Sequence, residues 1–324
     1  MGSFTIVPAW IVEDAIVFAV AVITVIFVLR NEKHPVSILM EMLCFIALYA
    51  AVYENLATLM GWYGYGRTLL MIGNVPLSVP LVEYLVVYAT LRVLATMDVP
   101  TWVKPFVVGG AAMVFDFALD PLAIKQVFVT LERTIGRWSW FMGPRDVGIY
   151  GEPVYNFAGW VLICGYAAAL LLLGRYWHRR SGYARAVGIA YPILTMIAAL
   201  GLVVSPLSSF LLWLGPFLSK GSFSEWIMLA VWLCVPVILL GIFWRGRMRE
   251  RFVFRENLPV LLTLAGLPVV TVLWTIASGL FQIVWIEALA ALALTGLLVA
   301  ARLRPAPASS RPRRITAPGA ARAR

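Results

Sequence analysis

The sequence of 324 residues has little charge and few of the residues that build metal or nucleophile sites in soluble enzymes. Only 13% of the residues are Asp, Glu, Lys or Arg, and there are three cysteines and two histidines. Cys44, Cys164 and Cys234 lie far apart inside apolar runs, where cysteine usually acts as a small buried residue. No His, Cys and carboxylate cluster has the spacing of metal ligands. The sequence therefore predicts neither a disulfide framework nor a metal site.

Signals for several other protein classes are also missing. The first 29 residues contain no Lys or Arg, so the positive segment of a cleavable signal peptide is absent. There is no glycine-rich dinucleotide fingerprint after a strand. The net charge of +10 comes from short basic clusters between apolar runs and from the tail, which suits control of membrane topology. We therefore expect no nucleic-acid partner and no cofactor.

What the sequence has is apolar length, because 62% of its residues are hydrophobic and apolar runs of about 20 residues recur. This pattern predicts an all-α fold, a polytopic transmembrane helical bundle over residues 1–304, followed by a disordered basic tail at 305–324. We predict nine spans. They are Ile11–Leu29, Val36–Met60, Val75–Ala95, Trp102–Leu122, Asn156–Trp177, a sixth from near Ala186, Glu225–Trp244, Leu258–Ala277 and Leu280–Leu303.

Basic residues predict the orientation of these spans. The loops 178–185 and 245–251 are the most basic and should be cytoplasmic. Residues 186–218 should then cross once, with a kink or a partly re-entrant end. Counting crossings places the N-terminus and the long loop at about 123–155 outside, and the tail inside. The prediction is a multi-pass protein of the cell membrane.

Carboxylates inside spans are costly and ask for a reason. With this topology, only Glu41 falls in the inner half of the membrane. The outer half holds Glu13, Asp14, Glu54, Glu83, Asp116, Asp120 and Glu287. The same half carries two aromatic, glycine-rich segments at 61–67 and 138–160. We therefore predict a functional site at the outer side, with the 123–155 loop as its catalytic loop.

Asp116 and Asp120 are four residues apart and share one helix face. Two close carboxylates in an apolar setting do not ionise together easily, so one can stay protonated and act as an acid. The structural alternative is that they bond helix ends or loop amides, Asp120 in particular, because Pro121 would end the helix there. For Glu54 and Glu83 the alternative is an ion pair with Arg67 or Arg92. Glu13 and Asp14 fit an interfacial position better.

The aromatic residues near this site have two interpretations. Trp and Tyr often form a belt at the membrane interface. Interleaved with glycine and next to buried acids, they also suit a cavity that holds a polyene or stabilises a carbocation. Asn156, which opens a predicted span, would either cap that helix or orient a water.

Three runs carry a resemblance: D-x-x-x-D-P at 116–121, RWSW at 137–140 and YGEPVYNFAGW at 150–160. Together they resemble the integral-membrane carotenoid biosynthesis family, whose characterised members hydrate the terminal double bond of acyclic carotenoid ends. These members are carotenoid 1,2-hydratases, bisanhydrobacterioruberin hydratase and γ-carotene 1′-hydroxylase. The resemblance covers roughly Glu54 to Trp160, and Glu152 departs from the pattern because it separates the glycine from the proline. The matching residues are Asp116, Asp120, Pro121, Trp138, Trp140, Tyr150, Gly151, Pro153, Asn156, Phe157, Gly159 and Trp160.

The resemblance implies a hydro-lyase that adds water across the C1–C2 double bond of an acyclic carotenoid, with no metal or cofactor. Asp116 or Asp120 would protonate the alkene, and Glu54 or Asp120 would guide the water. Trp138, Trp140 and Tyr150 would shield the cation. Glu83, Tyr65, Asn156 and Trp160 complete the expected substrate-binding residues. The expected partners are a carotenoid or isoprenoid lipid, the membrane and other carotenoid biosynthesis enzymes.

Two other functions remain open at this point. A membrane prenyltransferase or lycopene elongase-like enzyme also uses D-x-x-x-D, to hold magnesium diphosphate. Such enzymes need a second Asp-rich motif, and this chain has only one. A non-catalytic lipid carrier or scaffold would also tolerate intramembrane acids.

Overall fold

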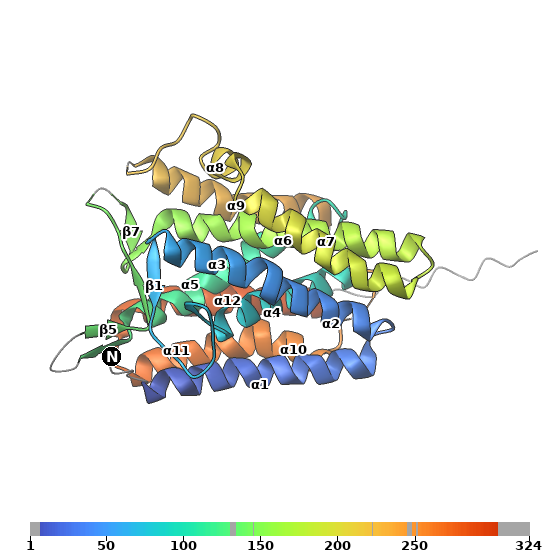
Figure 1. Ribbon diagram of the computed structural model, residues 1–324, viewed down its shortest axis with the longest axis horizontal. Coiled ribbons are helices and arrows are strands. Elements are labelled where there is room, and N and C mark those ends of the chain that lie inside the picture. The colour runs from blue at the N-terminus through green and yellow to red at the C-terminus, as the bar shows by residue number, and fades with distance from the viewer. Residues whose placement is uncertain are drawn as a thin grey trace, which may run out of the picture.

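A bundle of long helices with short strands gathered at one end forms the protein (Figure 1). The computed structural model describes residues 7–129, 134–144, 146–221, 223–244, 248–250 and 252–303. Within these ranges, nine helical segments are long and apolar enough to cross a membrane. The all-α polytopic bundle predicted from the sequence is therefore confirmed, and the chain is a multi-pass membrane protein.

The helices follow the predicted spans with ends that differ by a few residues. Seven spans are single helices: α1 (Pro8–Asn31), α4 (Ser78–Thr96), α5 (Lys104–Lys125), α6 (Val154–Arg180), α7 (Arg185–Val203), α9 (Ser224–Trp244) and α12 (Phe281–Leu303). The second span is α2 (Pro35–Cys44), η1 (Phe45–Ala50) and α3 (Ala51–Leu59). The eighth is η2 (Phe254–Asn257), α10 (Leu258–Leu261), η3 (Leu262–Gly266) and α11 (Leu267–Ala277).

Details of two helices differ from the sequence prediction. Pro121 does not end its helix, because α5 continues to Lys125. A proline removes one backbone hydrogen bond, and membrane helices tolerate this when neighbouring helices support the turn. The second span contains the π-helical turn η1 directly before α3, which carries Glu54. Such turns often occur near functional sites.

Between α7 and α9 the described residues form one further helix, the short α8 (Pro206–Leu212). This agrees with the expectation that residues 186–218 contain one long span followed by a kink. The predicted tail at 305–324 and four residues of the basic loop 245–251 lie outside the described residues. The domain division and the orientation in the membrane stay predictions.

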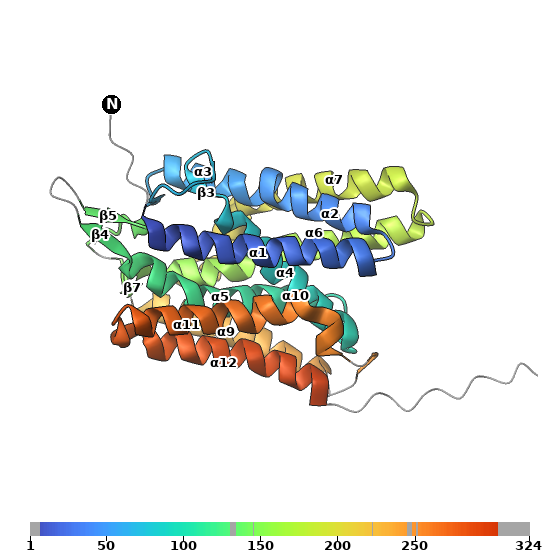
Figure 2. The ribbon, with the colours of Figure 1, turned by 90° about the horizontal axis from the view of Figure 1, so that it is seen from below.

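In the part of the chain that the structure describes, eight short strands form four antiparallel pairs. The pairs are β1 (Tyr63–Tyr65) with β6 (Trp138–Trp140), β2 (Met71–Ile72) with β3 (Val75–Pro76), β4 (Val127–Val129) with β5 (Thr134–Gly136), and β7 (Gly148–Ile149) with β8 (Glu152–Pro153). Val75 and Pro76 were predicted to open the third span and instead lie in β3. Figures 1 and 2 place the labelled strands at the same end of the bundle, opposite the turns that join α1 to α2 and α6 to α7.

Helices α5 and α6 pack at the centre of the bundle with their backbones in contact. A Cβ atom added to Gly109 of α5 would lie 2.2 Å from the carbonyl oxygen of Val161 on α6. Only glycine allows this approach. Because α5 carries Asp116 and Asp120 and α6 carries Asn156, this contact fixes the distance between predicted site residues.

A buried ion pair lies in the half of the bundle away from the strands. The Glu41 carboxylate is fully buried and accepts hydrogen bonds from Arg175 Nε at 2.8 Å and from Arg175 Nη2 at 2.5 Å. The hydroxyl of Tyr191 donates a third bond, 2.5 Å long. These three side chains join α2, α6 and α7, and they give both Glu41 oxygens a hydrogen-bond partner.

Candidate active site

A two-stranded ribbon joins the loop after α3 to the loop after α5. In an antiparallel pair, alternate side chains share one face, and the residues between them point to the other. Tyr63 lies opposite Trp140, and Tyr65 lies opposite Trp138, with Gly64 and Ser139 between them. The ring centroids of the two pairs are 4.5 Å and 5.9 Å apart. Four aromatic rings therefore form one surface at the strand end of the bundle.

Buried charges hold this ribbon against α1. The Gly66 amide donates to the Arg137 carbonyl over 2.8 Å, and the Arg137 guanidinium forms ion pairs with Glu13 and with Asp14. Asp14 also accepts a 2.7 Å bond from Ser78. Burial lowers the pKa of Arg137 to about 10, so the guanidinium stays charged at neutral pH. The Asp14 side chain is buried and paired, and its interfacial position stays a prediction.

Three carboxyl groups meet beneath the ribbon. Asp116 and Asp120 lie on one face of α5, and Glu152 comes from β8, so that one oxygen from each lies within 4.8 Å of the others. Asp116 and Glu152 are almost completely buried. The Asn156 amide donates to Glu152 over 2.5 Å and to Asp116 over 3.4 Å. Asn156 thus bridges two acids and does not cap its helix, which begins at Val154.

A tight hairpin turn places Glu152 in this cluster. Tyr150 and Gly151 both have positive φ, 55° and 103°, as the two central residues of a primed hairpin turn require. Burial, and then the Asp120 charge, raise the pKa of Glu152 well above its usual range. Sequence reasoning took Glu152 only as a departure from a motif. Its position four residues before Asn156 was the signal that could have placed it beside the acids.

The carboxyl cluster has no counter-charge. Among the described residues, no Lys or Arg forms an ion pair with Asp116, Asp120 or Glu152. One oxygen of each of these side chains is buried and lacks a hydrogen-bond partner in the described part of the chain. Three buried carboxylates so close together cannot all be ionised. The cluster therefore holds at least one proton at neutral pH.

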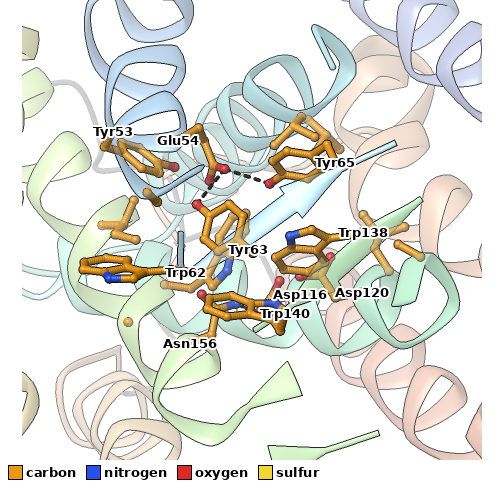
Figure 3. A pocket seen from close by; sticks show the side chains of 18 of the residues that line it. Tyr53, Glu54, Trp62, Tyr63, Tyr65, Asp116, Asp120, Trp138, Trp140 and Asn156 are labelled. Carbon is orange, nitrogen blue, oxygen red and sulfur yellow. Dashed lines mark hydrogen bonds between the residues drawn. The ribbon is translucent and has the colours of Figure 1, made fainter. Parts of the chain in front are cut away.

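Glu54 lies on the other side of the same pocket and is held by tyrosines. The hydroxyls of Tyr63 and Tyr65 donate to the same Glu54 oxygen over 2.8 Å and 2.7 Å (Figure 3). Burial, followed by the Glu54 charge, raises the pKa of both tyrosines well above the usual range, so both remain donors.

The sequence left open an ion pair of Glu54 or Glu83 with an arginine. In the described residues, both acids accept hydrogen bonds from tyrosine hydroxyls. Glu83 accepts a hydrogen bond from Tyr53, and Arg92 pairs with Glu32. The two glutamates are therefore neighbours of tyrosine hydroxyls in an apolar setting. Such a setting leaves an acid without the cation that would fix its charge.

Most of these groups, though not Glu152, line a cavity of about 920 Å³. Its wall includes most of the predicted site residues: Glu54, Tyr65, Asp116, Asp120, Trp138, Trp140, Asn156 and Trp160. Two predicted residues lie elsewhere. Glu83 is buried behind Tyr53, and the Tyr150 hydroxyl bonds the Gln282 carbonyl and the Trp285 indole of α12. Tyr150 therefore supports the hairpin from outside and does not face the cavity.

Comparison with known proteins now adds the family. A family model described as "Carotenoid biosynthesis protein" matches residues 13–219, which is more than half of the chain and contains the ribbon, Glu54 and the cluster of Asp116, Asp120 and Glu152. The chain belongs to the carotenoid biosynthesis protein family. The search of curated proteins and the search of solved structures gave no match. The resemblance found in the sequence is confirmed at the level of the family, and with it a role in carotenoid biosynthesis.

The cavity of this carotenoid biosynthesis protein opens sideways. Leu56, Met60 and Val204 line it and are also exposed on the flank of the bundle between α3 and α8. On the opposite side it reaches α1 and α11 at Val17 and Leu267, which are more covered. The flank of a membrane-spanning bundle faces lipid. A long apolar molecule can therefore enter from the bilayer and bring one end under the ribbon.

Proposed function

We propose that the chain is a hydratase that adds water across the terminal C1–C2 double bond of an acyclic carotenoid end group. The observation that carries the proposal is the cluster of carboxyl groups of Asp116, Asp120 and Glu152, each with a buried oxygen that has no partner in the described part of the chain, at an aromatic cavity. Hydration of an unactivated alkene needs a strong acid, room for a tertiary cation and a water. The family supports a carotenoid as the substrate.

Asp116 is the proposed acid. Its carboxyl proton passes to C2 of the alkene, which forms a C–H bond, breaks the π bond and leaves a tertiary cation at C1. The Asp116 carboxyl group lies beside those of Asp120 and Glu152, with one oxygen of each within 4.8 Å of the others. Asn156 holds Asp116 and Glu152 in place through its two hydrogen bonds. General acid catalysis of this kind contributes typically about 10²–10⁴-fold.

The cation is stabilised by the faces of aromatic rings, and the water attacks it. Trp138, Trp140 and Tyr63 line the cavity beside the acids, and a π face attracts a cation at close range. The water forms its C–O bond at C1 and gives its spare proton to a carboxylate, Asp120 or Glu54. This proton balances the one that Asp116 donated, so the net reaction is addition of one water.

The prenyltransferase alternative uses the same acids in another way. Three carboxyl oxygens within 4.8 Å of one another can bind a divalent cation, and magnesium diphosphate would suit Asp116, Asp120 and Glu152. A diphosphate also needs free cations nearby. The two cationic side chains in the cavity wall are each paired already, Arg137 with Glu13 and Asp14, and Lys220 with Asp146. The arrangement therefore favours hydration.

Expression in cells that accumulate lycopene tests the proposal. The pigments are extracted and their masses compared with those of cells that carry an empty vector. Hydration adds the mass of one water at an end group and persists when the purified protein is assayed with a chelator. Addition of a prenyl unit that stops with the chelator would favour the transferase. Unchanged pigment with all acyclic carotenoids offered would favour the carrier or scaffold.

A further inference from the structure

Two indole N–H groups at the cavity have no use in the fold. Trp138 Nε1 and Trp140 Nε1 are buried, and neither has a hydrogen-bond partner among the described residues. The Trp138 side chain is 6% exposed. A buried N–H group without an acceptor costs about 1–3 kcal/mol, and tryptophans usually find a partner when they are buried. Both N–H groups can therefore donate to an acceptor that is not part of the described chain, such as a bound water or ligand.

The two donors belong to the same cavity as the unpartnered acid oxygens. Trp138 and Trp140 line it together with Asp116 and Asp120, whose Oδ1 and Oδ2 atoms also lack a partner in the described part of the chain. The two indole rings are 5.5 Å apart. In Figure 3 the four labelled side chains gather on the side of the pocket opposite Glu54.

These side chains offer the two donors and the acceptor that one bound water needs. A buried water typically makes about three hydrogen bonds, both as donor and as acceptor. Two N–H groups can donate to its lone pairs, and a carboxylate oxygen can accept one of its protons. The tyrosines do not supply the donors, because the hydroxyls of Tyr63 and Tyr65 are engaged by Glu54.

We propose that the indole N–H groups of Trp138 and Trp140, with Asp120 Oδ2, bind the oxygen that becomes the product hydroxyl. This inference rests on the proposed hydratase function and assigns its water site. The two tryptophans are then more than an apolar wall, because they aim the water at the cation. When the water attacks, its oxygen forms the bond to C1, and one of its protons passes to Asp120.

The site determines the fate of the cation. A cation that is not captured returns its C2 proton to the acid and becomes the alkene again. In deuterium oxide, a return that removes the original C2 hydrogen or a hydrogen of a C1 methyl group, in place of the added deuteron, leaves deuterium in the recovered substrate, whereas capture gives a deuterated hydrate. Weakening the water site should therefore shift the cation from capture to return, while protonation by Asp116 continues.

The test uses Trp138→Phe and Trp140→Phe in the purified full chain, with the acyclic carotenoid in deuterium oxide. Phenylalanine keeps an aromatic face and removes the N–H group. Hydrate formation should fall about three- to tenfold for each variant, as expected for one lost hydrogen bond. Deuterium in recovered alkene should persist or rise. Trp102→Phe, on an exposed ring that packs against Phe243 away from the cavity, is the control and should change neither quantity.

The ratio of deuterated alkene to hydrate separates the possible outcomes. A fall of both quantities together would show that the tryptophans act through packing and would overturn the water site. Unchanged hydrate formation in both variants would overturn it as well. If the wild type forms neither deuterated alkene nor hydrate, the proposed function itself fails, which is a different result from a wild type that hydrates and variants that do not respond.

Discussion

Buried acids are paired with a cation at one end of the bundle and lie among other acids at the other end. Glu41 meets Arg175 through two hydrogen bonds and Tyr191 through a third, so its charge is neutralised and its oxygens are satisfied. Asp116 has a similar burial at the other end, with two more acids as its neighbours. One end has a paired charge that joins three helices. The other end holds acids together against their mutual repulsion.

This difference separates structure from chemistry. Breaking a buried ion pair costs stability, whereas an unpaired acid cluster destabilises the fold and persists only where something else requires it. Strained or unsatisfied polar groups concentrate at functional sites. We therefore expect substitutions in the Glu41 cluster to change stability, and those in the Asp116 cluster to change turnover.

The largest effect should come from Asp116→Asn. The amide cannot donate an acidic proton, so hydration should fall by about 10²–10⁴-fold while the protein stays folded. The matched control is Glu41→Gln, which makes the same kind of change in the paired cluster and should leave the rate per folded molecule unchanged. Pigment analysis measures hydrate formation, and unfolding of the protein in detergent measures its stability. Equal activity of Asp116→Asn and wild type would remove Asp116 as the acid.

Arg175→Met should show the opposite profile. It leaves the Glu41 carboxylate buried without its cation, so the free energy of unfolding should fall by about 3–5 kcal/mol. The double variant Glu41→Met, Arg175→Met should recover much of this loss, because no charge is left buried. Thermal unfolding in detergent measures both. A single variant as stable as the wild type would contradict the structural role of the pair.

Glu152→Gln should alter the pH dependence of stability. The Glu152 pKa is raised in the folded protein above the value of 4.5 for a free glutamate, so the folded state keeps a proton that the unfolded state has lost. Stability should therefore fall as the pH rises above about 4.5. In Glu152→Gln this fall should be shallower, as unfolding followed across the same pH range would show. An unchanged slope would mean that Glu152 is ionised in the folded state.

The smallest effects should come from a pair of tyrosines. Tyr191→Phe and Tyr65→Phe each remove one hydroxyl that donates to a buried glutamate. The first should lower the free energy of unfolding by about 1.5–3 kcal/mol with turnover unchanged. The second should lower turnover by about threefold, because Tyr63 still holds Glu54. A loss of turnover in Tyr191→Phe, with a loss of stability alone in Tyr65→Phe, would contradict the assignment of the two ends.

Much of the fold could be predicted because span length alone specifies a membrane helix. The positions of Asp116 and Asp120 on one helix face also followed from their spacing. The ribbon could not be predicted, since β1 and β6 have three residues each and lie more than 70 residues apart in sequence. The alternation of YGY and WSW was visible, but nothing local showed that the two would pair.

The sequence did not show where Glu152, Tyr150 and Glu83 lie, and the hairpin explains the first two. Glu152 and Tyr150 lie in a hairpin whose turn sends one side chain to the acids and the other to α12. A register shift of one residue would turn the Glu152 side chain to the other face of the hairpin, and spacing along the chain does not fix that register. Glu83 was placed at the cavity because it is an outer-half acid, whereas its depth on α4 sets it behind Tyr53.

The most direct test of the central claim is a side-by-side assay of wild type, Asp116→Asn and Glu41→Gln with an acyclic carotenoid in deuterium oxide. The wild type and Glu41→Gln should give a hydrate with the hydroxyl on C1 and deuterium on the neighbouring C2. Asp116→Asn should give neither hydrate nor deuterated alkene. A deuterated hydrate from Asp116→Asn at the wild-type rate would contradict the claim that the unpaired acids are the proton source.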